Sequence, residues 1–164
     1  MTDKPFQSVL TDLIINPLHL SNTFPYYSNN IDLLSHPIFG NRDFNKLPKI
    51  GVNNISSAVG NIVSDAGDLN KFIRALFIDK VLLDSTSLAS MLTFQTFDKT
   101  RIGLGVFKEE YGGRNVIGHS GRTLSFISYA FVDENSGKSY ILLTNNMNDP
   151  FIDQLIEKIC KLKK

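Results

Sequence analysis

Hydrophobic and polar residues follow two different periods along the chain, and the change of period divides it into a helical part and a sheet part. Apolar residues recur at steps of three and four in residues 4–15 and again in residues 65–77, which predicts a helix in each range. From about residue 102 the step shortens to two, the period of a half-buried strand. Four strands are predicted, at residues 102–108, 114–119, 125–132 and 139–144.

Capping residues predict where the helices begin. Ser64 is expected to cap the helix from Asp65 to Phe77, and Asp84 or Ser85 to cap a second helix that ends near Leu92. The first helix should stop at Asn16, because the residue before a proline avoids the α conformation.

Turn signals separate the strands, and one more helix follows them. Gly112-Gly113 and Asn135-Ser136-Gly137 are typical of turns between neighbouring strands. Asp149 is expected to cap the final helix, with Pro150 at its first position. The predicted buried face of this helix consists of Phe151, Ile152, Leu155, Ile156 and Ile159.

Helices that precede an antiparallel meander predict an α+β fold, with a sheet of about four strands and flanking helices. A length of 164 residues suits a single domain, residues 1–164. Its expected segments are a helix and Pro-Leu segment (1–24), an irregular loop (25–55), helices (56–92), the sheet (102–145) and a C-terminal helix (149–163).

Composition excludes several classes of function. The formal net charge of +1 gives no general attraction to nucleic acid or to an anionic membrane. No apolar stretch approaches the ~20 residues that span a bilayer, and the first residues lack the apolar core of a signal peptide. Cys160 is the one cysteine, so an internal disulfide is impossible and a buried structural thiol is expected. We therefore expect a soluble protein.

The candidate chemistry lies in the triplet His119-Ser120-Gly121, at the end of a predicted strand. Taken alone, the triplet could be an ordinary strand end without a function, with the glycine marking a bulge. On a strand beside a cleft, His119 could donate to a carbonyl or carboxylate, and Ser120 could add a hydroxyl. Gly121 would leave room for a ligand, and the backbone N–H of Arg122 could form one arm of an oxyanion hole.

The triplet resembles the Lys- or His-(Thr/Ser)-Gly motif of the serine β-lactamase and penicillin-binding-protein family, above all its class C β-lactamase, D-alanyl-D-alanine carboxypeptidase and esterase branch. In the family this motif lies on the strand that borders the active site. Other stretches resemble family segments in the same order: INPLHLSNTF (15–24), SSAVGNIVSDAGDLNKFIRALF (56–77), IGLGVF (102–107) and YILLTNN (140–146). In the first of them, His19 stands where the family usually has glycine.

The resemblance implies a partial β-lactamase/transpeptidase-like fold and a hydrolase that transfers an acyl group from an amide or ester. His119 and Ser120 would then bind substrate and support the proton relay. Gly121 and Arg122 would complete the set of catalytic residues, with the Arg122 N–H helping to hold the oxyanion. Asn145 would contact substrate at the rim, although a turn-forming asparagine is the alternative. The substrate would be a small molecule or a peptide.

Two parts of the family's machinery are missing from the sequence. The chain contains no Ser-x-x-Lys, the motif that carries the nucleophile and its activating lysine. Thr96-Phe97-Asp98-Lys99 is the nearest match, but it has threonine and is expected in a linker. Tyr27-Ser28-Asn29 spells the family's Tyr-x-Asn, yet it follows the Pro-Leu segment that it should precede.

Two functions remain open from the sequence. The first is the C-terminal part of a β-lactamase-related serine hydrolase, inactive alone because the nucleophile is absent. The second is a non-catalytic binding module that uses the cleft wall or an open sheet edge. In the family, N-terminal strands pair with the strand before the last helix. Without them we expect the chain to form a homodimer through the 139–144 strand, or to cover that edge locally.

Other ligands fit the sequence poorly. His19, His36 and His119 have no metal-ligand spacing, and no glycine-rich phosphate loop is present, so no metal and no cofactor is expected. Residue usage rich in Asn, Ile and Lys suggests a bacterial source, and the resemblance implies a periplasmic or secreted parent enzyme.

Overall fold

The computed structural model describes residues 3–25, 35–36, 38–39, 42–43, 60–98, 100–123, 126–146 and 151–162. Its centre is a six-stranded antiparallel sheet with the strand order β10-β9-β8-β7-β6-β5. The strands are β5 (Gln95–Phe97), β6 (Thr100–Ile102), β7 (Phe107–Tyr111), β8 (Arg114–Arg122), β9 (Ile127–Asp133) and β10 (Ser139–Thr144). The predicted α+β class is confirmed, but the sheet is larger than the four strands expected.

The difference arises around residues 102–108, predicted as one strand. This range holds the end of β6, a tight turn and the start of β7. The turn is closed by Gly103 N, which donates to Val106 O over 2.8 Å, and Gly105 adopts a φ of 72° that other residues rarely take. The apolar alternation continues through the turn, so periodicity alone did not reveal it.

The remaining strands lie close to their predicted positions. β10 has the predicted bounds, and β9 is shifted by one or two residues. β8 runs on past residue 119 to Arg122, so the whole of the His-Ser-Gly triplet lies within a strand. Both predicted turns connect neighbouring antiparallel strands, β7 to β8 and β9 to β10.

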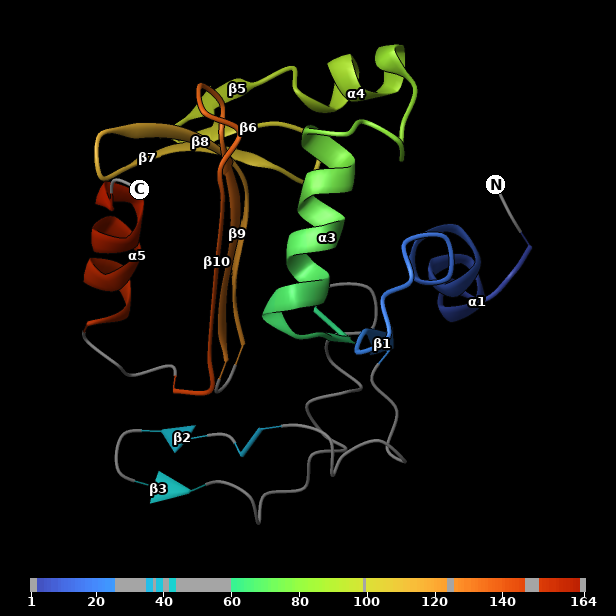
Figure 1. The fold of residues 1–164 in the computed structure, drawn as a ribbon, viewed down its shortest axis with the longest axis horizontal. Helices are drawn as coiled ribbons and strands as arrows, with labels where there is room; N and C mark the ends of the chain where they lie inside the picture. Colours follow the sequence, from blue (N-terminus) through green and yellow to red (C-terminus); the bar gives the residue numbers. More distant parts are fainter. Residues whose placement is uncertain are drawn as a thin grey trace.

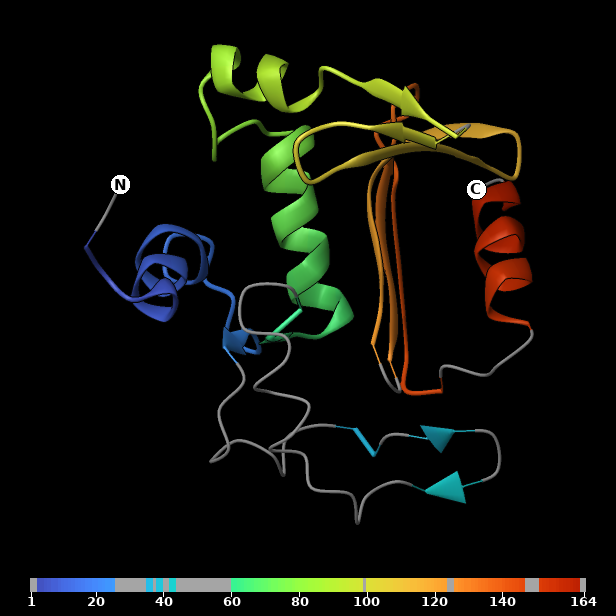
Figure 2. The same cartoon turned by 180° about the vertical axis from the view of Figure 1, so that it is seen from behind.

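The helices are α1 (Phe6–Leu10), the π-helix η1 (Thr11–Ile15), α3 (Ala66–Phe77), α4 (Ser85–Met91) and α5 (Ile152–Lys161). Helices α3 and α5 cover opposite faces of the sheet, whereas the N-terminal helix lies apart from it (Figures 1 and 2). Figures 1 and 2 show α3 on one side of β8–β10 and α5 on the other, with β5–β7 bending across one end. None of the helices in the described part of the chain is long and apolar enough to cross a membrane.

Caps explain where the middle helices begin. The predicted cap Ser64 is wrong, because the N-cap of α3 is Asp65, whose carboxylate accepts from Asp68 N over 2.8 Å. Of the two residues predicted to cap α4, Asp84 is the N-cap, and its carboxylate accepts from Ser87 N over 2.8 Å. An aspartate suits both positions because its negative carboxylate also interacts favourably with the positive, N-terminal end of the helix dipole.

The N-terminal helix is less regular than predicted. It begins as α1 and changes to the π-helix η1 before Asn16. Leu10 is buried, whereas Phe6 and Leu13 are 45% and 61% exposed, so the apolar stripe of this segment is mostly uncovered among the described residues. After it, the short strands β2 (Ile38–Phe39) and β3 (Arg42–Asp43) pair within the predicted loop, 25–55. The short strand β1 (Phe24–Pro25), at the start of that loop, pairs with β4 (Ile62–Val63), which lies in the range predicted as helices, 56–92.

A buried carboxylate joins the Pro-Leu segment to α3. Asp68 is 2% exposed and accepts hydrogen bonds from Asn22 N (2.7 Å), Thr23 Oγ1 (3.1 Å) and Lys71 Nζ (2.8 Å). Burial alone would raise the pKa of Asp68, but the bonds from Lys71, Asn22 and Thr23 hold this pKa below its ordinary value. Asp68 therefore has a larger structural role than the first-turn helix residue that its position in the sequence indicates.

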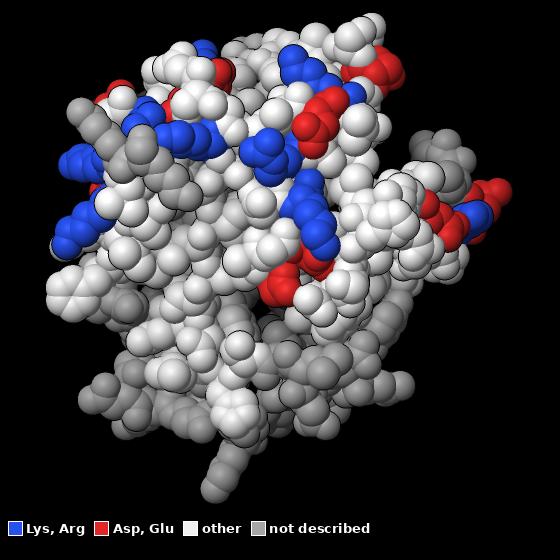
Figure 3. All heavy atoms as spheres, viewed as in Figure 1, with Lys and Arg blue, Asp and Glu red and all other residues white. Residues whose placement is uncertain are grey.

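β10 forms one edge of the sheet, since β9 is its only strand partner in the described ranges. Its six residues, SYILLT, carry no charge and no proline. In Figure 3, viewed as in Figure 1, the middle of the face where β10 lies is mostly white, and charged side chains lie mainly above it. This edge lacks the charges that usually protect an exposed strand.

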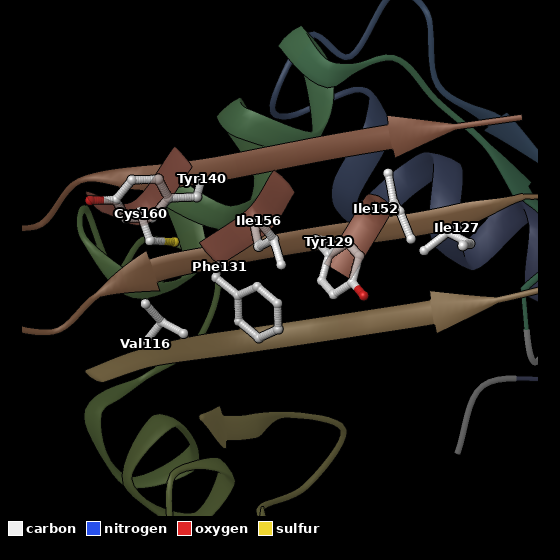
Figure 4. Close-up of a cluster of buried hydrophobic side chains, with 8 residues drawn as sticks. All are labelled: Val116, Ile127, Tyr129, Phe131, Tyr140, Ile152, Ile156 and Cys160. Atoms are coloured by element: carbon white, nitrogen blue, oxygen red, sulfur yellow. The ribbon is translucent and has the colours of Figure 1, made fainter. Parts of the chain in front are cut away.

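The core consists of one apolar cluster on each side of the sheet. Figure 4 shows the cluster between the sheet and α5, which contains Val116, Ile127, Tyr129, Phe131, Tyr140, Ile152, Ile156 and Cys160. The cluster on the α3 and α4 side contains Ile73, Leu76, Phe77, Leu88, Val106, Ile117 and Val132. Neighbouring strand residues alternate between the two clusters, as the pleat of a strand requires.

The buried face of α5 differs in part from the prediction. Ile152, Ile156 and Cys160 are buried, whereas Phe151 and Leu155 are 67% and 41% exposed. The predicted cap, Asp149 with Pro150, lies outside the described residues. Cys160 is a buried free thiol, as expected, and burial raises its pKa to about 11.

Candidate functional site

The candidate site lies at the C-terminal end of β8. β7 pairs with β8 only as far as Gly118, which lies opposite Phe107, whereas β9 pairs with β8 as far as Arg122. Among the residues that the structure describes, the last four residues of β8, His119 to Arg122, therefore have a strand on one side and none on the other. This is a local edge, where a ligand can lie alongside a strand.

The hydrogen-bonding register determines which backbone groups point to the open side. Glu134 N donates to Asn115 O, and Thr123 N donates to Phe126 O, so the odd-numbered residues of β8 are those that bond to β9. In an antiparallel pair the intervening residues direct their N–H and C=O groups away from the partner. The backbone N–H groups of Ser120 and Arg122 consequently point away from β9, toward the open side.

Gly118 allows β8 and β9 to approach closely just before the site. A Cβ atom at this position would lie 2.0 Å from Ala130 O and 2.8 Å from Phe131 Cα. Both contacts are with backbone, which cannot move aside. Glycine is therefore required here for packing, whatever the neighbouring residues bind.

His119 is exposed, and its ring stacks on Phe107 of β7. The two ring centroids are 4.7 Å apart, and the planes are inclined by 26°. The stack fixes one face of the imidazole, while the exposed remainder can still reach a ligand.

Ser120 and Gly121 continue the strand. Ser120 is partly buried and lies opposite Tyr129 in the register. A Cβ atom at Gly121 would lie 3.0 Å from Ser128 Oγ, so the absence of a side chain here leaves room for that hydroxyl. The expectation that Gly121 leaves room for a ligand stays a prediction.

Asn145 lies at the same end of the sheet. Ile127 is the register partner of both Arg122 and Thr144, so Asn145 follows β10 about two strand spacings, ~10 Å, from Arg122. Its Nδ2 donates to His36 O over 2.6 Å, and its own carbonyl accepts from Ile38 N over 2.8 Å. The Asn145 amide thus anchors the segment around residue 36, a contact that the sequence did not indicate.

Of the other motifs, the structure describes only part of the Thr96 to Lys99 segment, which lies away from this site. Thr96 to Asp98 lie in the β5–β6 hairpin at the far edge of the sheet, not in a linker as expected, and Lys99 is outside the described residues. Tyr27-Ser28-Asn29 also lies outside them. Within the described part of the chain, no group of three His, Cys, Asp or Glu side chains could hold a metal ion.

Two hollows of the surface lie elsewhere. One, of about 350 Å³, lies beside α4 and is lined by Lys80, Leu83, Ser85, Leu88, Ala89 and Leu92. The other, of about 390 Å³, is lined by Thr100, Arg101, Lys108, Glu109, Glu110, Tyr111 and Asn115. Neither of these two hollows is lined by His119, Ser120 or Arg122.

Comparisons with known proteins identify a family and a shared fold. The sequence model of a family described as Beta-lactamase matches residues 1–158. A D-stereospecific amidohydrolase from a Streptomyces species is 27% identical, with a TM-score of 0.71 over 89% of this chain and 45% of that one. The D-amino acid amidase from Ochrobactrum anthropi SV3 complexed with D-phenylalanine is 25% identical, with a TM-score of 0.75 over 94% and 55% of the chains. The chain thus spans about half the length of these solved structures.

Proposed function

Because the chain belongs to the beta-lactamase family of serine hydrolases, we propose that it forms the substrate-side wall of an amide-hydrolysing site. His119 hydrogen-bonds the carbonyl or carboxylate of the substrate, and Ser120 and Asn145 add polar contacts. The N–H of Arg122 serves as one arm of the oxyanion hole. The observation that carries this assignment is the register of β8, which directs that N–H away from β9.

The substrate class is proposed from the solved structures that the chain resembles. Two of them that are at least 25% identical are a D-stereospecific amidohydrolase and a D-amino acid amidase, the latter in complex with D-phenylalanine. We assign to this chain the amides of apolar D-amino acids. The nucleophile and its activating lysine come from outside these 164 residues, since the sequence contains no Ser-x-x-Lys.

Binding of D-phenylalanine amide to the isolated chain tests the proposal. Titration followed by ¹H–¹⁵N NMR should shift the amides of residues 119–122 in a saturable way, and L-phenylalanine amide should bind more weakly. His119→Gln should weaken binding about tenfold, the loss expected for one hydrogen bond to a polar ligand. His19→Asn is the matched control, because it replaces another exposed histidine and should leave the affinity unchanged. Saturable shifts centred away from β8 would overturn the assignment.

Turnover provides a second readout. The isolated chain should not hydrolyse D-phenylalanine amide, because it lacks an activated nucleophile. If the chain hydrolyses the amide and Ser120→Ala abolishes the activity, Ser120 is the nucleophile and its role as a binding group is wrong.

The alternative function is a non-catalytic binding module, and the uncharged edge strand β10 is the observation that favours it. An unpaired edge can accept an additional strand by main-chain hydrogen bonds. In this case the occupant is a second copy of the chain, which pairs along β10 to form a homodimer.

A further inference from the structure

The side chain of Arg122 ends in a three-residue network. Arg122 Nη2 lies 2.5 Å from Asp153 Oδ1 and 3.3 Å from the hydroxyl of Tyr129. The Tyr129 hydroxyl donates to the same Asp153 oxygen over 2.5 Å. The network therefore joins the end of β8 to the middle of β9 and to the first turn of α5.

α5 is held against β8 at both of its ends, in each case by an arginine of that strand. Near the start of β8, Arg114 Nε donates to Cys160 O in the last turn of α5. At the end of β8, Arg122 contacts Asp153 in the first turn. The two arginines are eight residues apart, an even number, so their side chains leave the same face of the sheet.

An exposed ion pair alone would contribute little to this arrangement. The side chains of Arg122 and Asp153 are 49% and 66% exposed, and pairs of this kind usually contribute less than about 1 kcal/mol. Tyr129, however, is only 4% exposed, and its hydroxyl needs an acceptor. Asp153 provides that acceptor, so its position is coupled to a buried side chain opposite Ser120.

We propose that Asp153 is a positioning residue of the candidate site, which holds the Arg122 side chain through Tyr129 and α5 and thereby fixes the direction of the Arg122 backbone N–H. The proposal rests on the proposed function, in which this N–H binds the oxyanion. With its side chain tied to α5 and its strand partner on one side only, Arg122 is held at two points. Loss of Asp153 leaves Arg122 with the strand pairing and the longer contact to the Tyr129 hydroxyl (3.3 Å), at a local edge.

The test uses ¹⁵N relaxation of the full chain without ligand. Asp153→Ala should lower the order parameter of the Arg122 amide from about 0.85, typical of rigid backbone, toward 0.6. Asp153→Asn keeps an oxygen that can accept from Tyr129 and should restore most of the rigidity. Glu157→Ala is the matched control. It also removes a contact of α5, the bond from Gly112 N to Glu157 Oε2 (2.6 Å), but at the other end of β8, and should leave the Arg122 amide unchanged.

Ligand binding separates this proposal from the proposed function. Asp153→Ala should weaken D-phenylalanine amide about tenfold, whereas Glu157→Ala should not. An unchanged Arg122 order parameter in Asp153→Ala overturns the positioning role even if the wild-type chain binds the amide. If the wild-type chain does not bind the amide, the proposed function fails, and the order parameters alone decide whether Asp153 fixes Arg122. A mere loss of stability would loosen β8 at both ends and in both variants, which also contradicts the proposal.

Discussion

His19 adopts a left-handed backbone conformation, with a φ of 51°. An L-residue in this conformation crowds its Cβ against the following carbonyl, at a cost of about 1–2 kcal/mol that glycine does not bear. The related family segment usually has glycine at this position, and the backbone conformation provides the physical reason. We therefore expect histidine in place of the family's glycine at position 19 to lower the stability of the chain.

We expect His19→Gly to raise the free energy of unfolding by about 0.5–1 kcal/mol, because relief of the strained φ exceeds the added freedom of the unfolded chain. Urea denaturation of the two proteins measures the difference. Asn16→Gly is the control, since residue 16 has a helical φ of −66°, and there glycine should lower stability. A loss of stability in His19→Gly would show that the imidazole makes contacts that outweigh the strain.

Individual residues could be predicted from the sequence where the chemistry is local. The glycines of the β7–β8 and β9–β10 turns and the cap Asp84 depend only on residues close to them in the chain, and the sequence indicated these positions. The turn at Gly105 was not predicted. The roles of Asp68 and Asp153 depend on partners 46 and 31 residues away, Asn22 and Arg122. The periodicity of the sequence does not reveal such pairs, because it indicates which face of a helix or strand a side chain lies on but not which distant residue that side chain contacts.

At the scale of elements, one buried carboxylate connects β8, β9 and the turn that follows β9. Asp133 is 1% exposed and accepts from Arg114 Nη1 (2.9 Å), Ser136 Oγ (2.7 Å) and Asn135 N (2.9 Å). Burial alone would raise its pKa, but the bonds from Ser136, Asn135 and Arg114 outweigh burial and lower it.

Stability should therefore fall in acid. Since the pKa of Asp133 is lower in the folded than in the unfolded chain, the carboxylate's contribution is complete above the unfolded pKa of ~4 and is lost as the pH falls through the folded value. Asp133→Asn should lower the free energy of unfolding by about 3 kcal/mol at pH 7, with the deficit narrowing below about pH 4.

Denaturation curves of Asp133→Asn between pH 7 and pH 3 measure this deficit. Asp12→Asn is the control, because Asp12 pairs with Lys4 on the surface, where both side chains are at least 47% exposed, and should change stability by less than about 0.5 kcal/mol. A difference in the free energy of unfolding that stays constant with pH would mean that the negative charge of Asp133 does not contribute to stability.

The elements themselves could be predicted where period and punctuation agree. β10 is bounded by a turn on one side and polar residues on the other, and it has the predicted bounds. The β6–β7 hairpin was missed because Ile102, Leu104 and Val106 keep a period of two through the turn. Leu104 is nevertheless 66% exposed, so its apolar side chain is not a core residue.

At the scale of the whole molecule, the chain has the α+β layers of its family but spans about half the length of the solved structures it matches. Long-range features, such as the curl of the sheet and the open side of β8, follow from strand order and register. Strand order could be inferred from the meander, but the register, which orients the Arg122 N–H, depends on cross-strand contacts that one sequence does not encode locally.

We expect the isolated chain to form a dimer through β10, which light scattering should show as twice the mass of the chain. Leu143→Lys places a charge on the edge strand, at a residue that is 38% exposed, and should give a monomer. Leu104→Lys, in the β6–β7 turn, is the matched control and should leave the dimer intact. A wild-type chain that stays monomeric at high concentration contradicts the dimer.

The close approach of β8 and β9 at Gly118 has a consequence for mutational surveys of this protein. A library that samples every substitution would find position 118 as intolerant as its neighbour His119, and a reader of that map would assign both to ligand binding. We expect the two effects to differ in kind: substitution at 118 should lower the abundance of folded protein, whereas under the proposed function substitution at 119 should leave abundance unchanged and weaken only binding. A survey that scores abundance and binding separately will distinguish a residue that shapes the strand from one that acts at its edge.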